Sequence, residues 1–119
     1  RTQSEPISIE AVLHALGVGS VRTVDPLEHE KAVEAVREAA ELSGVRAIVF
    51  RSPCIAVVRG GKPMRVTDAC VGCGRCIREL GCPGLSLSGG RAVIDESLCR
   101  GCTLCAQLCP KGCIVEKEA

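Results

Sequence analysis

The sequence predicts an α+β protein in two parts: an open β-α-β segment, followed by a smaller unit built on an internal repeat of cysteines. Two observations lead to this prediction. Over the first half, apolar residues alternate between strand-like and helix-like spacing, and Cys54 is the only cysteine. The second half is short and rich in glycine, and it holds the other nine of the ten cysteines. We place the domain boundary after residue 62, so the two domains cover residues 1–62 and 63–119.

The first helix and strand signals lie near the N-terminal end. Ser8 can cap a short helix, and Gly17 can end it. The apolar face of this helix consists of residues at helical spacing: Ile9, Val12, Leu13 and Leu16. A brief strand is predicted at residues 20–24.

A longer helix and a second strand complete this segment. Residues 25–28, Asp-Pro-Leu-Glu, resemble a capping box with proline at the first helical position, so we expect a helix from there to about Ser43. Its expected inner face is Ala32, Val33, Val36, Ala39 and Ala40. Residues 45–50 are apolar and β-branched, which predicts a buried parallel strand after a right-handed crossover.

One β-α-β unit cannot cover both faces of its own sheet. We therefore interpret residues 1–62 as the end of a larger α/β domain, and a small self-sufficient domain is the alternative. This half contains no glycine-rich phosphate loop, no Ser/His/Asp constellation and no acidic cluster for Mg²⁺. His14 and His29 fall on predicted helices and are interpreted as surface residues.

Composition and charge exclude several classes of function. The 15 basic and 14 acidic residues leave a net charge of +1, and Phe50 is the only aromatic residue, so we expect no nucleic-acid binding. No apolar run approaches the roughly 20 residues that cross a bilayer, and the N-terminal residues have no signal-peptide pattern. We therefore expect a cytoplasmic protein without membrane contact.

Two cysteine triplets of identical spacing lie 29 residues apart, from position 70 to position 99. The first consists of Cys70, Cys73 and Cys76, and the second of Cys99, Cys102 and Cys105. A Cys-Pro pair follows each triplet, with Cys82 after five residues and Cys109 after three. The second copy matches the C-x₂-C-x₂-C-x₃-C-P run of bacterial ferredoxins, and the first matches it with two extra residues.

This spacing suits cubane [4Fe–4S] clusters, in which each of four irons needs one thiolate. Three cysteines two residues apart can surround three irons in one loop, while the fourth iron faces away. In two-cluster ferredoxins the fourth ligand is the Cys-Pro cysteine of the other repeat. We therefore expect cluster I on Cys70, Cys73, Cys76 and Cys109, and cluster II on Cys99, Cys102, Cys105 and Cys82.

Zinc and disulfides are the alternative explanations of the cysteines. Cys₄ zinc sites use two C-x₂-C pairs for each metal and need no third cysteine at the next step. Disulfide scaffolds are secreted and space their cysteines irregularly. Outside the two ligand sets, Cys54 is expected to be a buried, inert thiol. We expect Cys113 to pack as a small apolar residue beside a cluster, although it could compete with Cys109 as a ligand.

The remaining residues of the second half are consistent with this picture. Gly72, Gly74 and Gly101 would let the loop backbone approach a cluster and point its N–H groups at the sulfurs. Residues 85–88 and 91–95 predict a hairpin around a Gly-Gly turn. Short strands are predicted at 64–66 and, closing the chain, at 114–117.

Across both halves, the sequence resembles the C-terminal end of the alpha subunit of indolepyruvate:ferredoxin oxidoreductases. Residues 15–18 (Ala-Leu-Gly-Val), 24–26 (Val-Asp-Pro) and 45–54 (Val-Arg-Ala-Ile-Val-Phe-Arg-Ser-Pro-Cys) look like the end of that family's thiamine-diphosphate-binding domain. The 70–76 loop, with its five-residue step to Cys82, and the 99–110 run look like its terminal ferredoxin domain.

The resemblance implies a role in a larger enzyme, which decarboxylates aryl 2-oxoacids, reduces an external ferredoxin and releases an aryl-acetyl-CoA and CO₂. Thiamine diphosphate and Mg²⁺ would bind only in the full-length enzyme, because the Gly-Asp-Gly to Asn segment that holds them is missing from this chain. The chain would then contain no catalytic residue and would only carry electrons. Its partners would be the remainder of the alpha subunit, a beta subunit and external ferredoxin.

A free-standing two-cluster electron carrier with an N-terminal α/β extension is the alternative function. The first half distinguishes the two, because an independent carrier has little use for an unclosed β-α-β unit.

Overall fold

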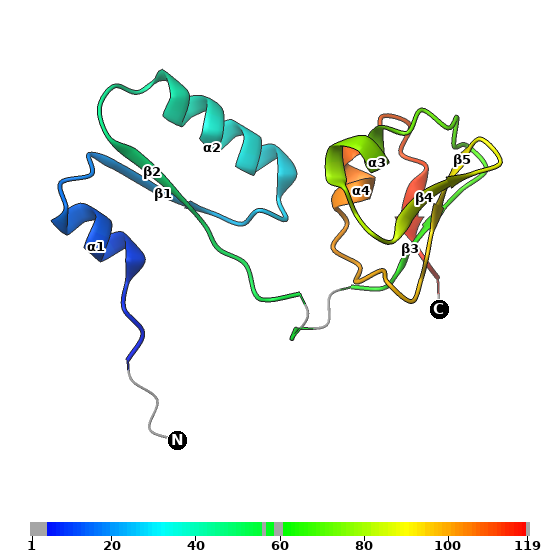
Figure 1. Ribbon diagram of the computed structural model, residues 1–119, viewed down its shortest axis with the longest axis horizontal. Coiled ribbons are helices and arrows are strands. Elements are labelled where there is room, and N and C mark those ends of the chain that lie inside the picture. Colours follow the sequence, from blue (N-terminus) through cyan, green and yellow to red (C-terminus); the bar gives the residue numbers. More distant parts are fainter. Residues whose placement is uncertain (1–4, 56, 59–60, 119) are drawn as a thin grey trace. The chain divides into compact units, whose positions relative to one another are not determined.

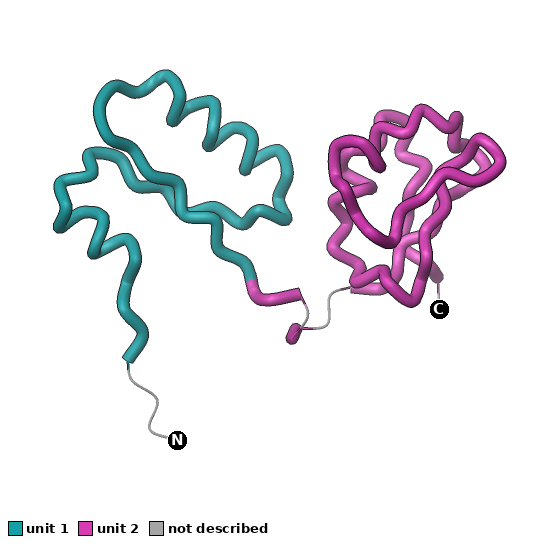
Figure 2. Tube along the Cα trace, in the orientation of Figure 1, with its two compact units in different colours: residues 1–52 teal, residues 53–119 magenta. Residues whose placement is uncertain are grey.

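The computed structural model describes residues 5–55, 57–58 and 61–118. The chain divides into two compact units, residues 1–52 and 53–119 (Figure 2). The domain boundary predicted from the sequence lies ten residues later, after residue 62. The assignment of the two parts to a thiamine-diphosphate-binding domain and a two-cluster ferredoxin domain stays a prediction.

The first unit begins with helix α1 (Ile9–Ala15), whose start and end are where the sequence predicts them. The Ser8 hydroxyl accepts a hydrogen bond from the backbone N–H of Ala11 at 3.2 Å, which satisfies one of the free donors of the first turn. Gly17 follows the helix with a φ of +81°, a left-handed conformation that glycine adopts without strain. None of the residues of α1, all of which are described, is buried.

Strands β1 (Ser20–Val24) and β2 (Arg46–Phe50) pair in parallel and are joined through helix α2 (His29–Glu41), as Figure 1 shows. Their register places Ser20 opposite Arg46 and Val24 opposite Phe50. Strand β1 has the predicted bounds, and β2 begins one residue later than predicted.

Helix α2 starts later than the sequence predicts. Asp25 makes a turn instead of a helix cap, because its carboxylate accepts the N–H of Leu27 at 2.8 Å and its carbonyl accepts that of Glu28 at 3.1 Å. Glu28 is then the residue before the helix, and it makes no side-chain capping bond.

The buried side of α2 is also rotated from the predicted one. Ala35 is fully buried, with Ala32 and Ala39 half-buried, whereas Val36 is 49% exposed and Ala40 is exposed. The three alanines recur at positions i, i+3 and i+7, which is one stripe of a helix, and Val36 lies about 100° away from Ala35. The expectation that Val36 and Ala40 face inward was wrong.

The second unit contains two antiparallel strand pairs and two short helices (Figure 1). Strand β3 (Met64–Val66) pairs with β6 (Ile114–Glu116), and β4 (Leu85–Ser88) pairs with β5 (Arg91–Ile94). The predicted hairpin and the two outer strands are thus confirmed to within one residue. Helix α3 (Arg75–Leu80) packs against helix α4 (Leu104–Leu108).

Each short helix starts inside one cysteine triplet, and the two loops have matching backbones. Gly72 and Gly101 have φ values of +65° and +68°, each two residues after the first cysteine of its triplet. The residues before the helices, Gly74 and Thr103, are also left-handed, with φ values of +67° and +63°. The spacing repeat in the sequence is therefore a repeat of backbone conformation as well.

The core of the second unit is small and rich in sulfur. Its buried members are Met64, Cys76, Leu85, Ala92, Cys105, Cys113 and Ile114. Among the described residues of the whole chain, no large side chain is fully buried. Apolar packing alone therefore gives this unit little stability.

Candidate metal centres

Two hollows in the second unit are lined by cysteines from both repeats. The first is lined by the whole first triplet together with Cys109, which follows helix α4. Its other lining residues are Val71, Gly74, Ala92, Pro110, Lys111, Cys113 and Ile114. The structure thus gathers, around one space, the four cysteines expected to hold cluster I.

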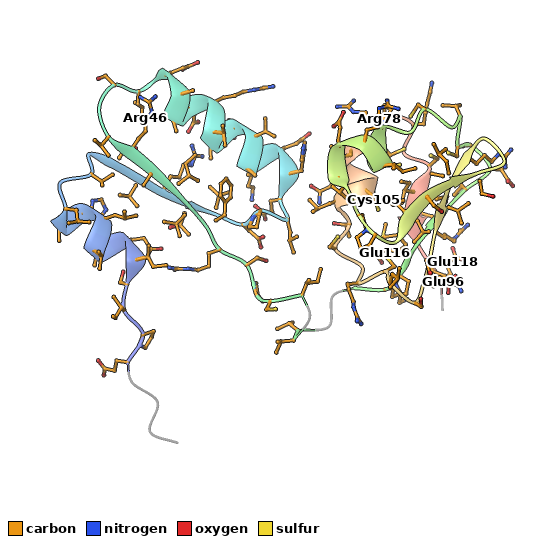
Figure 3. All side chains as sticks on the ribbon, viewed as in Figure 1. Arg46, Arg78, Glu96, Cys105, Glu116 and Glu118 are labelled. Atoms are coloured by element: carbon orange, nitrogen blue, oxygen red, sulfur yellow. The ribbon has the colours of Figure 1, made fainter. Side chains whose placement is uncertain are left out.

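The second hollow is lined in the same way, with the roles of the two repeats exchanged. It is lined by the second triplet and by Cys82, which follows helix α3. Met64, Leu80, Gly84, Leu85, Ile94 and Arg100 complete its wall. The two hollows are of nearly equal size, about 330 and 340 Å³ when the space open to solvent is counted. Figure 3 labels Cys105, which belongs to helix α4 in this unit.

Backbone amides point at the sulfurs of both hollows. Cys70 accepts hydrogen bonds from the backbone N–H groups of Ala92 and Gly72, and these hold its pKa below the ordinary value of a thiol. In the other hollow, the N–H of Met64 lies 3.3 Å from the sulfur of Cys99. Donors of this kind stabilise negative charge on sulfur, which is what a cluster ligand carries.

Cys109 lies in the densest of these donor arrangements. Burial opposes its ionisation more strongly than any other single effect. The N–H groups of Lys111, Gly112 and Cys113, together with the Cys113 thiol, outweigh burial and hold the pKa of Cys109 below its ordinary value. The residues after the Cys-Pro pair thus wrap their backbone around this sulfur.

The third cysteine of each triplet is the most buried one, and its pKa is raised instead of lowered. Burial raises the pKa of Cys105 to about 11, and the neighbouring sulfurs of Cys102 and Cys99 add to the effect. Burial and the charges of Cys109 and Cys73 raise the pKa of Cys76 in the same way. Metal binding must therefore displace a proton from each of these thiols, so binding is favoured as the pH rises.

The two cysteines outside the predicted ligand sets differ from each other. Cys54 is exposed, so the expectation of a buried thiol was wrong. Its carbonyl accepts the N–H groups of Val57 and Val58, which forms a turn, and both valines are exposed. Cys113 is 4% exposed, as expected of a packed residue, but its sulfur also lies 3.3 Å from that of Cys109.

Sites for a single metal ion are a separate matter from cubane sites. Among the described residues, no three His, Cys, Asp or Glu side chains converge as a group that could hold one metal ion. The thiolates around a cubane each bind a different iron, so this finding concerns mononuclear sites.

Within the part of the chain that the structure describes, helices are too short or too polar to span a bilayer.

The second repeat matches a known family, and most of the chain matches known proteins. Residues 92–115 match the model of the 4Fe–4S binding domain. The chain is 40% identical over 116 residues to the indolepyruvate oxidoreductase subunit IorA of Methanothermobacter marburgensis, and 36% identical over 115 residues to that of Archaeoglobus fulgidus. These alignments cover 94% and 91% of this chain. The chain corresponds to one part of the IorA proteins.

The IorA relatives are much longer proteins. The alignments cover 19% and 18% of the two relatives, so the chain spans about a fifth of their length and corresponds to their C-terminal part. A shorter relative is Ferredoxin-3 of Nostoc, which is 38% identical over 65 residues covering 39% of this chain and 67% of that protein. The chain therefore contains a 4Fe–4S binding domain and is similar to one part of these much longer subunits.

Proposed function

We propose that the chain carries electrons through two [4Fe–4S] clusters within an indolepyruvate-type 2-oxoacid oxidoreductase. The observation that carries this proposal is the lining of the two hollows. Each contains three cysteines of one repeat and the Cys-Pro cysteine of the other, which is the ligand set expected for each cluster. The matched family model covers the second triplet, and the names of the relatives supply the enzyme class.

A bound cubane supplies one chemical capability, the uptake and release of single electrons. The chain's own groups supply the charge environment. The amides of Ala92 and Gly72 on Cys70, and that of Met64 on Cys99, would stabilise the negative charge that each site gains with an added electron. The low polarity of the lining strengthens these hydrogen bonds.

The rest of the reaction belongs to parts of the protein beyond this chain. We infer that decarboxylation of an aryl 2-oxoacid on thiamine diphosphate and Mg²⁺ takes place there, in the remainder of the alpha subunit. A beta subunit completes the enzyme, aryl-acetyl-CoA and CO₂ leave it, and an external ferredoxin accepts the electrons from this chain.

A free-standing electron carrier is the second candidate, favoured by the similarity to Ferredoxin-3. The exposed apolar residues of the first unit favour the larger enzyme instead: Ile7, Leu16 and Val45 are 81%, 75% and 71% exposed. Residues 1–65 expressed alone should bind a hydrophobic dye and self-associate. A well-folded, monomeric fragment would favour the independent carrier.

Metal and sulfide analysis tests the electron-carrier proposal. Anaerobically purified chain should be brown and contain roughly eight iron and eight sulfide, because each of two cubanes contributes four of each. Reduction with dithionite should produce low-temperature EPR signals from both clusters. A colourless protein loaded with zinc, or one whose cysteines are joined as disulfides, would refute the proposal.

A further inference from the structure

Cys113 is a buried thiol in contact with a proposed cluster ligand, and the ligand sets do not include it. It immediately precedes strand β6, is 4% exposed and belongs to the core of the second unit. Its sulfur lies 3.3 Å from that of Cys109, and it also hydrogen-bonds the sulfur of Cys70. It thus joins one cysteine of the first triplet to the cysteine that the second repeat contributes.

In the second hollow, the residue after the glycine that follows the Cys-Pro pair is a leucine instead of a cysteine. After Cys82-Pro83, the chain passes through a glycine to Leu85, which is 8% exposed and lines that hollow. After Cys109-Pro110, it passes through Lys111 and a glycine to Cys113, which lines the first hollow. Among the described lining residues of the second hollow, every cysteine belongs to the predicted set of four. The additional thiol is therefore a difference between two otherwise matching sites.

We propose that Cys113 is a positioning residue that donates its S–H to the Cys109 sulfur and thereby makes the reduction potential of cluster I more positive. The inference rests on the proposed function, since it requires a cluster in each hollow. Thiols are weak donors, but a hydrogen bond to a charged acceptor in an apolar site is stronger than the same bond in water. The reduced site is the more negatively charged, so the donor stabilises it more than the oxidised site.

The step concerned is the transfer of one electron. The reductant loses one electron and cluster I gains it, while no bond to Cys113 forms or breaks and its proton stays on its sulfur. The effect is confined to one hollow, because the hydrogen-bond partners of the Cys113 thiol are the sulfurs of Cys109 and Cys70. Cys113 therefore shifts the distribution of a single electron between the two clusters towards cluster I.

The test is an EPR-monitored redox titration of the 119-residue chain and its variants, with dithionite as reductant. The signal that disappears in a Cys73→Ala variant identifies cluster I. In Cys113→Ala, the potential of cluster I should become more negative and that of cluster II should stay unchanged. We expect the electron distribution to change by up to about tenfold, which is about 59 mV for one electron.

Two further variants separate the hydrogen bond from packing. Cys113→Ser keeps a donor of similar size, so its cluster I potential should lie nearer that of the parent chain than Cys113→Ala does. Cys54→Ala removes an exposed thiol and should change neither potential. Iron content should stay at about eight in all three variants, because none removes a proposed ligand.

The inference fails if Cys113→Ala leaves the cluster I potential unchanged or shifts both clusters equally. It also fails if Cys113→Ala and Cys113→Ser each lose about four iron, because Cys113 would then be a ligand or a structural requirement of the site. Failure of the proposed function is distinguishable from these outcomes. It would be seen in the parent chain itself, as an iron content far below about eight.

Discussion

Gly72 and Gly101 lie where another segment of backbone takes the place of a side chain. A Cβ at Gly72 would be 1.9 Å from the carbonyl oxygen of Gly90, and one at Gly101 would be 2.3 Å from that of Gly61. From the sequence, these glycines are expected to let the loop backbone approach a cluster closely. The structure adds that the loops are also crossed by the β4–β5 turn and by the segment before β3. The lack of a side chain at both glycines thus lets the cysteine loops pack closely against the rest of the unit.

Replacing either glycine by alanine should destabilise the second unit more than alanine at Gly81 does. Gly81 has a similar φ of +59° but nothing within 4 Å of its added Cβ, so it reports the left-handed strain alone. That strain costs about 1–2 kcal/mol, and the overlaps at Gly72 and Gly101 should cost about 1–3 kcal/mol more. Urea unfolding followed by loss of the cluster absorbance measures the difference. Equal losses in Gly72→Ala and Gly81→Ala would contradict the packing account.

Glu10 connects helix α1 to the strands of the first unit. Its carboxylate accepts hydrogen bonds from the Thr23 hydroxyl at 2.9 Å and from the Arg51 guanidinium at 3.0 Å. A backbone hydrogen bond, followed by those from Thr23 and Arg51, lowers the pKa of Glu10 to about 2 from an ordinary value of 4.5. The charged carboxylate is therefore the form that holds the helix.

The first unit should lose stability in acid through this residue. Because the folded pKa is the lower one, the stability that Glu10 contributes is present above pH 4.5 and is lost as the pH falls towards 2. Helical circular dichroism during urea unfolding at several pH values measures this loss. Glu10→Gln should flatten the profile between those values, whereas Glu34→Gln on the exposed side of α2 should keep it. An unchanged profile in Glu10→Gln would show that the contacts contribute nothing.

At the scale of elements, α2 shows how a helix chooses its buried side. Apolarity alone favours the valines, but small side chains let a helix lie close to a two-stranded sheet. Ala35 has the lowest exposure, 0%, of the buried residues in the first unit. The helix therefore packs through its alanines, and Val36 is half exposed.

Substitutions at neighbouring positions of α2 should therefore have very different effects. Ala35→Leu should destabilise the first unit by about 1–3 kcal/mol, because the added atoms overfill a closed contact. Val36→Ala should change the free energy of unfolding by less than about 0.5 kcal/mol, as is usual for surface positions. Urea unfolding by circular dichroism compares them. A larger loss in Val36→Ala would restore the inner face predicted from the sequence.

The elements that the sequence predicts well are those decided by local pattern. Strands β1, β3 and β4 have the predicted bounds because apolar and β-branched residues are flanked there by turn residues. The start of α2 was missed because Asp25 can cap either a helix or a turn, and the side chain alone does not decide between them. Helices α3 and α4 have only six and five residues, too few for a periodic pattern, and their buried residues are Cys76 in α3 and Cys105 and Leu108 in α4.

At the scale of the whole molecule, the second unit has a small apolar core and the first leaves apolar residues exposed. The second has a core in which three of seven buried members are cysteines, so the binding of clusters should supply much of its folding energy. The first exposes large apolar residues on its helices and connecting segments, and its IorA relatives are about five times longer than this chain. We therefore expect each unit to gain stability from something outside its own side chains.

The candidate sites were predictable from the sequence to the extent that covalent spacing determines them. Every cysteine predicted for one cluster lines the same hollow. Local loop geometry gathers each triplet, and the fourth cysteine was predicted from the ligand exchange of two-cluster ferredoxins. The amides of Ala92 and Met64 could not be predicted, because they reach the sulfurs through the long-range pairing of strands. The contact between the Cys113 and Cys109 thiols was not predicted either, although the sequence shows an additional cysteine four residues after Cys109.

Double variants test most directly whether the fourth ligand of each cluster comes from the other repeat. Cys82→Ser combined with Cys102→Ala removes two ligands of cluster II only, so the purified chain should keep about four of eight irons. Cys82→Ser combined with Cys73→Ala damages both clusters and should leave almost no iron. Cys109→Ser combined with Cys73→Ala removes two ligands of cluster I only, so this variant should also keep about four irons. If Cys82→Ser with Cys73→Ala keeps about four irons instead, each repeat holds its own cluster and the exchange of ligands is wrong.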